Sequence, residues 1–183
     1  TSLMAGSPAD LLYQASLTNG ADLLQNLIRD ARIESADAQP AIDELFADGK
    51  LTELKAEYVM ATPQWDTLQS RALNMVAAYH ENFPLRRGVP REELKSRLKI
   101  ETKLFNLMLE KLDEAEILVH AGQKVKMPEH GIKFGSAEQA KISGLMRQVE
   151  ENPFAPPTIK ASIEEVGEDI FNALIATDEL FML

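Results

Sequence analysis

The 183-residue sequence contains no cysteine and no long apolar run. Without cysteine the chain cannot form disulfides, thiolate metal sites or a cysteine nucleophile, so thiol redox chemistry is excluded. No stretch of about 18 consecutive apolar residues occurs, and the N-terminus lacks a basic stretch followed by an apolar core. We therefore predict neither a membrane span nor a secretory signal, and expect a soluble, cytoplasmic protein.

Motifs of catalysis and metal binding are also missing. The sequence has no glycine-rich phosphate loop, no Gly-x-Ser-x-Gly elbow and no His-Glu-x-x-His pair. His80, His120 and His130 lack the spacing of zinc ligands, and we assign them surface or structural roles. Adjacent acids such as Glu92 and Glu93 lie near expected helix ends, where they offset the helix dipole. We predict no catalytic site, metal site or cofactor in this chain.

Positive charge is scarce outside the middle of the chain. The net charge is -10, with four basic and ten acidic residues in 1–62, eleven and ten in 63–130, and four and nine in 131–183. Lysine and arginine supply most of the affinity for a phosphate backbone. Only the middle segment is therefore expected to face nucleic acid.

The hydrophobic pattern indicates helices followed by short hairpins. Ser7 and Ser35 are expected helix caps, and helical spacing covers 7–19, 21–32 and 35–49. The period then changes to extended segments at 51–54 and 58–60, which predicts a β-hairpin. Three helices followed by a hairpin is the order of a winged-helix module.

The same order returns twice along the chain. The second copy has a helix over 65–83, another from Pro90, a third over 100–112, and extended segments at 117–120 and 124–127. The third copy has a helix capped by Ser136 that Asn152 and Pro153 break, helices over 159–165 and 168–178, and a strand from 180 to 183. The post-helix strands begin 66 and 63 residues apart, a weak internal repeat.

We therefore predict a mainly α protein of tandem winged-helix modules over 1–62, 63–130 and 131–183. A strand at 180–183 has no return partner, which would leave backbone donors and acceptors unpaired. We expect the last module to be incomplete at its C-terminus, so that the chain is part of a longer protein.

One basic cluster stands out in the middle segment. It comprises Arg86, Arg87, Arg91, Lys95, Arg97 and Lys99. We take it as the candidate RNA-backbone contact. The alternative is that Lys95 and Arg97 merely solvate the outer face of a short helix. In that arrangement Leu94 and Leu98 point inward.

The run HENFPLRRGVPREELKSRL over 80–98, with FNL at 105–107 and PFAPP at 153–157, resembles bacterial selenocysteine-specific elongation factors of the SelB type, in their C-terminal winged-helix array. The resemblance implies a GTP-dependent factor, with magnesium, that delivers selenocysteinyl-tRNA to the ribosome and holds an insertion hairpin of the mRNA. The GTPase, tRNA-binding and hairpin-binding parts are expected outside this chain. These modules would then form the arm between the two ends.

Two other classes use the same fold. A DNA-binding regulator should carry a basic recognition helix and a basic wing. The third helix of the second copy offers mainly Glu101, Lys103 and Asn106, and Lys124 and Lys126 are the only wing charges of that kind. A protein-binding scaffold needs no basic face, and exposure of strand edges or of the apolar stripe from 65 to 83 would favour it.

Overall fold

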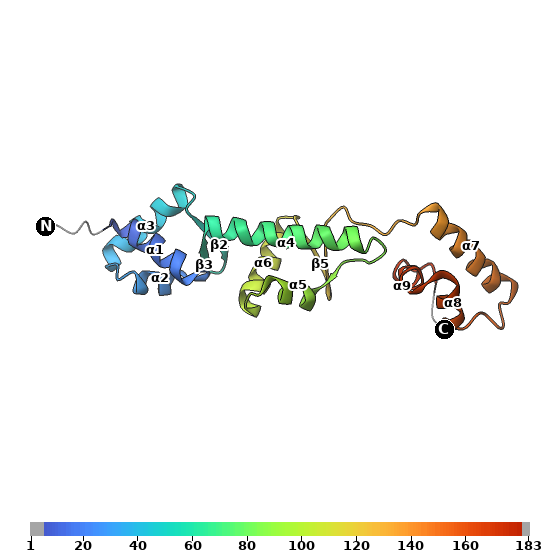
Figure 1. Ribbon diagram of the computed structural model, residues 1–183. Coiled ribbons are helices and arrows are strands. Elements are labelled where there is room, and N and C mark those ends of the chain that lie inside the picture. The colour runs from blue at the N-terminus through green and yellow to red at the C-terminus, as the bar shows by residue number, and fades with distance from the viewer. Residues whose placement is uncertain (1–5, 181–183) are drawn as a thin grey trace. The chain divides into compact units, whose positions relative to one another are not determined.

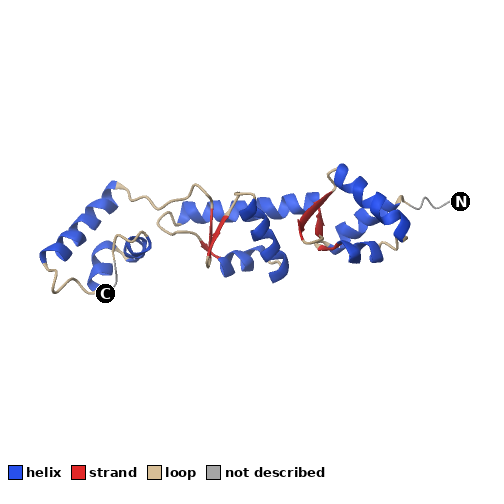
Figure 2. Ribbon diagram, turned by 180° about the vertical axis from the view of Figure 1, so that it is seen from behind, coloured by secondary structure: helices blue, strands red, loops and turns tan. Residues whose placement is uncertain are grey.

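The computed structural model describes residues 6–180, which fold into helices and two small antiparallel sheets (Figure 1, Figure 2). The chain divides into two compact units. One contains the residues up to Asn74 together with Lys95–Ile117, and the other contains Met75–Leu94 together with the residues from Leu118 onward. The predicted fold class, mainly α with short hairpins, is confirmed. Within residues 6–180 no helix is long and apolar enough to cross a membrane.

The first helix, α1 (Pro8–Asn19), begins with the expected cap. The Ser7 hydroxyl accepts a hydrogen bond from the Asp10 N–H, and the Asp10 carboxylate accepts one from the Ser7 N–H, both at 3.1 Å. Pro8 occupies the first helical position, where an N–H would have no partner in the helix. The helix ends before Gly20, whose φ of 74° suits a residue without a side chain.

A three-stranded sheet and two more helices complete the first module. These elements are β1 (Asp22–Leu23), α2 (Leu24–Asp30), α3 (Ser35–Ala47), β2 (Leu51–Lys55) and β3 (Tyr58–Ala61). The sheet order is β1-β3-β2, with antiparallel pairing throughout. The core is formed by Ala9, Leu12, Leu27, Ala41, Ile42, Leu45, Leu51 and Val59. Helices and sheet bury their apolar faces against each other, as in a winged helix.

Two local predictions in this module are wrong. Residues 21–32 do not form one helix, because β1 pairs with β3 before α2 begins. Ser35 is not a cap: Glu34 holds the N-cap position, and no side chain there bonds to the helix backbone. In both places contacts formed by the folded chain outweigh the local preference.

The same order of elements follows in the second module. It contains α4 (Thr62–Asn82), β4 (Val89–Pro90), α5 (Arg91–Leu98), α6 (Thr102–Glu114), β5 (Val119–Ala121) and β6 (Lys124–Lys126). The sheet order β4-β6-β5 matches that of the first sheet. The apolar stripe of α4 is buried, at Trp65, Leu68, Ala72, Val76 and Tyr79. Its burial shows that the stripe serves packing rather than the docking of a partner.

Three helices form the last part of the described chain. They are α7 (Ser136–Glu151), α8 (Ile159–Val166) and α9 (Glu168–Ala176), around a core of Ile142, Leu145, Val166, Ile170, Phe171 and Leu174. Ser136 is not the cap of α7, because Gly135 takes that position and donates its N–H to the Glu138 carboxylate at 2.7 Å. Residues 181–183 of the expected final strand lie outside the described residues. The module boundaries at 62 and 130 stay a prediction.

Candidate nucleic-acid interface

The six basic residues singled out by the sequence follow one another from the loop after α4 to the turn after α5. Arg86 and Arg87 lie before β4, Arg91 opens α5, Lys95 and Arg97 lie on α5, and Lys99 follows it. The first three belong to one compact unit and the last three to the other. Neither unit by itself contains the whole cluster.

Helix α5 buries one face and exposes cations on the other. Leu94 and Leu98 are buried, which confirms that they point inward. Lys95 is half-buried, and Arg97 and Lys99 are exposed. A contact of these three cations with RNA remains a proposal.

Arg86 is held by the protein itself. Its guanidinium donates to the Asp169 carboxylate on α9, at 3.3 Å from Nη2, and to the Tyr79 hydroxyl at 3.3 Å. It also lies over the Phe83 ring, 4.1 Å from the centroid. The hydrogen bond to Tyr79 and the nearby Asp169 raise the pKa of Arg86 above its ordinary value. Arg86 therefore joins the loop before β4 to α9 and is poorly placed to leave for a phosphate.

Arg91 is also tied to its own unit. Its Nη1 donates to His120 Nε2 at 2.7 Å, and its backbone N–H donates to the Gln123 carbonyl at 2.9 Å. These bonds attach the start of α5 to the hairpin formed by β5 and β6. The side chain is half-buried, so its first role is structural.

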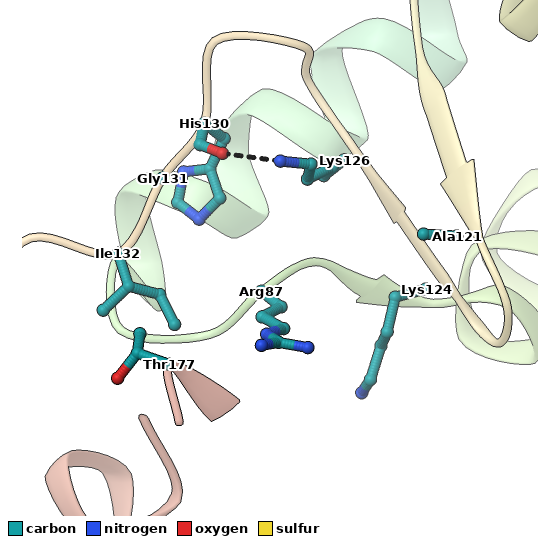
Figure 3. A pocket seen from close by; sticks show the side chains of 8 residues that line it. All are labelled: Arg87, Ala121, Lys124, Lys126, His130, Gly131, Ile132 and Thr177. Carbon is teal, nitrogen blue, oxygen red and sulfur yellow. Dashed lines mark hydrogen bonds between the residues drawn. The ribbon is translucent and has the colours of Figure 1, made fainter. Parts of the chain in front are cut away.

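Arg87 points away from these contacts. It faces the wing of the second module, which is the hairpin formed by β5 and β6. It lines a hollow of about 370 Å³ together with Ala121, Lys124, Lys126, His130, Gly131, Ile132 and Thr177 (Figure 3). Arg87 and Lys124 extend their side chains to the same side of the wing. Three cations therefore share one depression, and no carboxylate is among the residues that line it.

The close approach of Arg87 to the wing depends on Gly88. A Cβ at position 88 would lie 2.6 Å from the Val125 carbonyl oxygen, closer than the Cβ atoms of folded proteins approach other atoms. The absence of a side chain lets the loop run directly against β6, and Val89 then pairs with Val125 in the sheet. Gly88 thus brings Arg87 beside lysines that lie almost 40 residues further along the chain.

The segment after β6 forms one wall of the hollow and is fixed by two stacked histidines. The rings of His80 and His130 lie 3.5 Å apart between centroids with an interplanar angle of 9°. The Met127 N–H donates to His80 Nε2 at 3.1 Å, and His130 Nε2 donates to the Arg86 carbonyl at 2.8 Å. Lys126 Nζ donates to the His130 carbonyl at 3.0 Å, which holds its ammonium in the hollow (Figure 3).

Burial lowers the pKa of His80 to about 4, with a further contribution from the neighbouring His130 and Lys126. The ring is therefore neutral at neutral pH, and a neutral ring can accept the Met127 N–H through Nε2. Within residues 6–180 the buried Nδ1 has no hydrogen-bond partner. The three histidines have structural contacts, and the described residues contain no group of three or more potential metal ligands.

Helix α6, which corresponds to the recognition helix of a DNA-binding winged helix, contacts the hairpin of the first module through exposed side chains. Lys55 on β2 forms ion pairs with Glu110 at 2.8 Å and Glu114 at 3.3 Å. The Lys103 ammonium lies over the Tyr58 ring, 4.1 Å from its centroid. Two of the exposed side chains on this helix, Glu110 and Glu114, are acidic and do not favour its entry into a DNA groove.

Sequence reasoning found Arg87, Lys124 and Lys126 separately but did not place them in one hollow. The cluster along residues 86–99 was grouped by nearness in sequence, whereas the fold separates it into paired and unpaired cations. A signal was present in Gly88, since a glycine before a strand marks a close backbone approach. That signal does not say which strand is approached.

Comparison with known proteins agrees with this architecture. Residues 73–127 match a family model described as the winged helix of elongation factor SelB. Among solved structures, the mRNA-binding domain of elongation factor SelB from E. coli, in complex with SECIS RNA, is similar with a TM-score of 0.50 and 11% identity, over 68% of this chain and 98% of that chain. No curated protein matches the sequence.

The order of helices and strands and the structural similarity define a protein of tandem winged-helix architecture. The family match is more specific. It identifies a winged-helix region of the SelB type at residues 73–127, which contains the hollow's three cations and the whole basic cluster.

Proposed function

We propose that this chain is the winged-helix arm of a selenocysteine-specific elongation factor. The observation that carries the proposal is the SelB-type match at residues 73–127. In this proposal, further parts of the same protein bind GTP with magnesium, selenocysteinyl-tRNA and the mRNA insertion hairpin. The arm connects the delivery end of the factor to the hairpin-binding end, on the ribosome in the cytoplasm.

The packing between the first two modules supports the role of an arm. β3 ends at Ala61 and α4 begins at Thr62, so no linker separates the two elements. The contacts of Lys55 and Tyr58 with α6 then add a second connection.

The charge distribution supports limited contact with RNA. The first and last segments are strongly acidic, whereas 63–130 is nearly balanced. We infer that RNA approaches the second module, where Arg87, Arg91, Lys95, Arg97 and Lys99 are the candidate backbone contacts. Arg86 is the least suited of the six, because its guanidinium already has an acidic partner. The acidic side chains of Glu110 and Glu114 on helix α6 argue against a DNA-binding regulator.

A titration distinguishes the arm from a hairpin-binding module. A fluorescently labelled SECIS hairpin is titrated with this chain and with a longer protein that includes the following module, each at two salt concentrations. A scrambled hairpin of equal length is the control. We expect this chain to bind both RNAs weakly and equally, and the longer protein to prefer the SECIS hairpin.

Two outcomes would contradict the proposal. Strong preference of this chain alone for the SECIS hairpin would make it the hairpin-binding module itself. Tight binding to duplex DNA in preference to both RNAs would support a DNA-binding regulator instead.

A further inference from the structure

The hollow beside the wing carries positive charge that the protein does not neutralise. Among residues 6–180, Arg87 and Lys124 form no ion pair and no side-chain hydrogen bond, whereas the adjacent Arg86 is paired with Asp169. Lys126 donates to a carbonyl oxygen, which leaves its full charge uncompensated. Cations kept this close together repel one another, so an arrangement of this kind is favoured by an anionic ligand.

A neighbouring hollow in the same unit provides an internal comparison. It shares Arg87 and Lys124 and is also lined by Arg86, which is paired with Asp169, and by Glu93 and Glu168. These carboxylates would repel an anion. The wing hollow is lined by three cations and by no carboxylate, so an anion is favoured on that side.

The chemistry of the three side chains specifies the ligand. Arginine presents a planar fork of donors that matches two oxygens of a phosphate, and lysine acts as a point charge beside it. The side chains of Arg87 and Lys124 are exposed and extend to the same side, where a long anionic strand can reach them (Figure 3). Lys126 is half-buried in the wall and contributes its charge from there.

We infer that the wing hollow binds a phosphodiester group of an RNA strand through Arg87 and Lys124, with Lys126 behind them. The inference rests on the proposed function for the choice of RNA, and it assigns the contact to residues from two distant parts of the sequence. The backbone contact is then made by the loop before β4 together with the wing, and α5 is not required for it.

The test compares two double variants that lose the same charge. Arg87→Ala/Lys124→Ala empties the hollow, and Lys141→Ala/Arg147→Ala removes two exposed cations of α7 that do not line it. Binding of a labelled hairpin RNA is measured by anisotropy over a range of salt. We expect the hollow variant to bind about tenfold more weakly or worse, and the slope of log affinity against log salt to become shallower by about 1 to 2.

Nuclear magnetic resonance on the unmodified chain gives an independent measurement. The amide signals of residues 87, 88 and 124–126 should shift on addition of the hairpin RNA. Inorganic phosphate at the same concentration should leave them in place, because a single ion lacks the extended charge of a strand. Both substituted side chains of the hollow variant are exposed, so circular dichroism should confirm an unchanged fold.

Three results would overturn the assignment. Equal loss in the two double variants would mean that only net charge matters. Unchanged binding in the hollow variant would mean that RNA is held elsewhere, which leaves the proposed arm intact. Shifts caused equally by inorganic phosphate would indicate a site for the free ion. By contrast, this chain could prefer the SECIS hairpin over the scrambled one while the hollow variant still binds more weakly. That result would count against the proposed function alone.

Discussion

Arg86 and Arg87 are identical in type and adjacent in sequence, yet they meet different surroundings. Arg86 lies over Phe83 and reaches Tyr79 and Asp169. Arg87 is exposed and faces the lysines of the wing. The first side chain therefore contributes to the stability of the unit, and the second is available to a ligand.

We expect Arg86→Ala to lower the free energy of unfolding by about 1–2 kcal/mol, because it removes a cation–π contact and charge-assisted hydrogen bonds at a partly exposed site. Arg87→Ala should change it by less than about 0.5 kcal/mol. Urea unfolding followed by circular dichroism measures both. Equal destabilisation by the two substitutions would contradict the assigned difference in role.

His80 makes the stability of the second unit depend on pH. Its pKa is about 4 in the folded chain against 6.5 for an ordinary histidine, so the unfolded chain takes up the proton first. The contribution of the neutral ring to stability is complete above pH 6.5 and is lost as the pH falls toward about 4. Burial is the main cause of the lowered pKa of His80. Lys126 and His130 lower it further, and Glu129 opposes the shift.

Thermal unfolding between about pH 7.5 and pH 4.5 should therefore show a falling midpoint. His80→Gln, which keeps an acceptor for the Met127 N–H but does not titrate, should flatten this dependence. His120→Gln leaves the stacked pair in place and should preserve it. If the melting temperature falls equally with pH in the unmodified chain and in both variants, His80 is not the cause of the fall.

At the scale of elements, the short strand β4 decides where the basic loop lies. Two residues, Val89 and Pro90, pair with β6, and Gly88 allows the loop before them to touch the Val125 carbonyl. The pairing is too short to hold alone, so the close approach at Gly88 matters for the whole edge of the sheet.

Gly88→Ala should destabilise the chain by about 1–3 kcal/mol, because the added methyl group meets backbone that cannot move aside without separating β4 from β6. Gly131→Ala is the matched control, since a Cβ there meets nothing within 4 Å. Chemical denaturation compares the two. If the two variants prove equally stable, the contact between Gly88 and β6 does not exist in solution.

At the scale of the whole molecule, α4 and the contact of α6 with β2 join the first two modules. Lys55→Glu would place three carboxylates together, at positions 55, 110 and 114. We expect a lower melting temperature at low salt and a smaller difference at high salt, because exposed charges are screened. Adding Glu110→Lys should restore the ion pair and recover most of the lost melting temperature. Failure of that rescue would argue against the ion pair.

Much of this architecture follows from local sequence signals. Ser7, Pro8 and Asp10 predicted the start of α1 correctly, and the change of period near residues 51 and 117 predicted both hairpins. These features were accessible because caps, turns and hydrophobic spacing act over a few residues. The resemblance of residues 80–98 to SelB-type factors likewise agrees with the match at 73–127.

Only the tertiary structure decided which polar residues work together. Strands β1 and β4 have two residues each, and their pairing partners lie more than 30 residues away, so no local pattern marks them. Ser35 and Ser136 resemble caps in sequence but lie one residue inside their helices. The division of the basic cluster into a paired Arg86 and an unpaired Arg87 depends on Asp169 and on the wing. The sequence by itself determined the order of the main helices and hairpins and the class of module, because those depend on neighbouring residues. The position of charge depends on contacts across the fold, which only the folded chain provides.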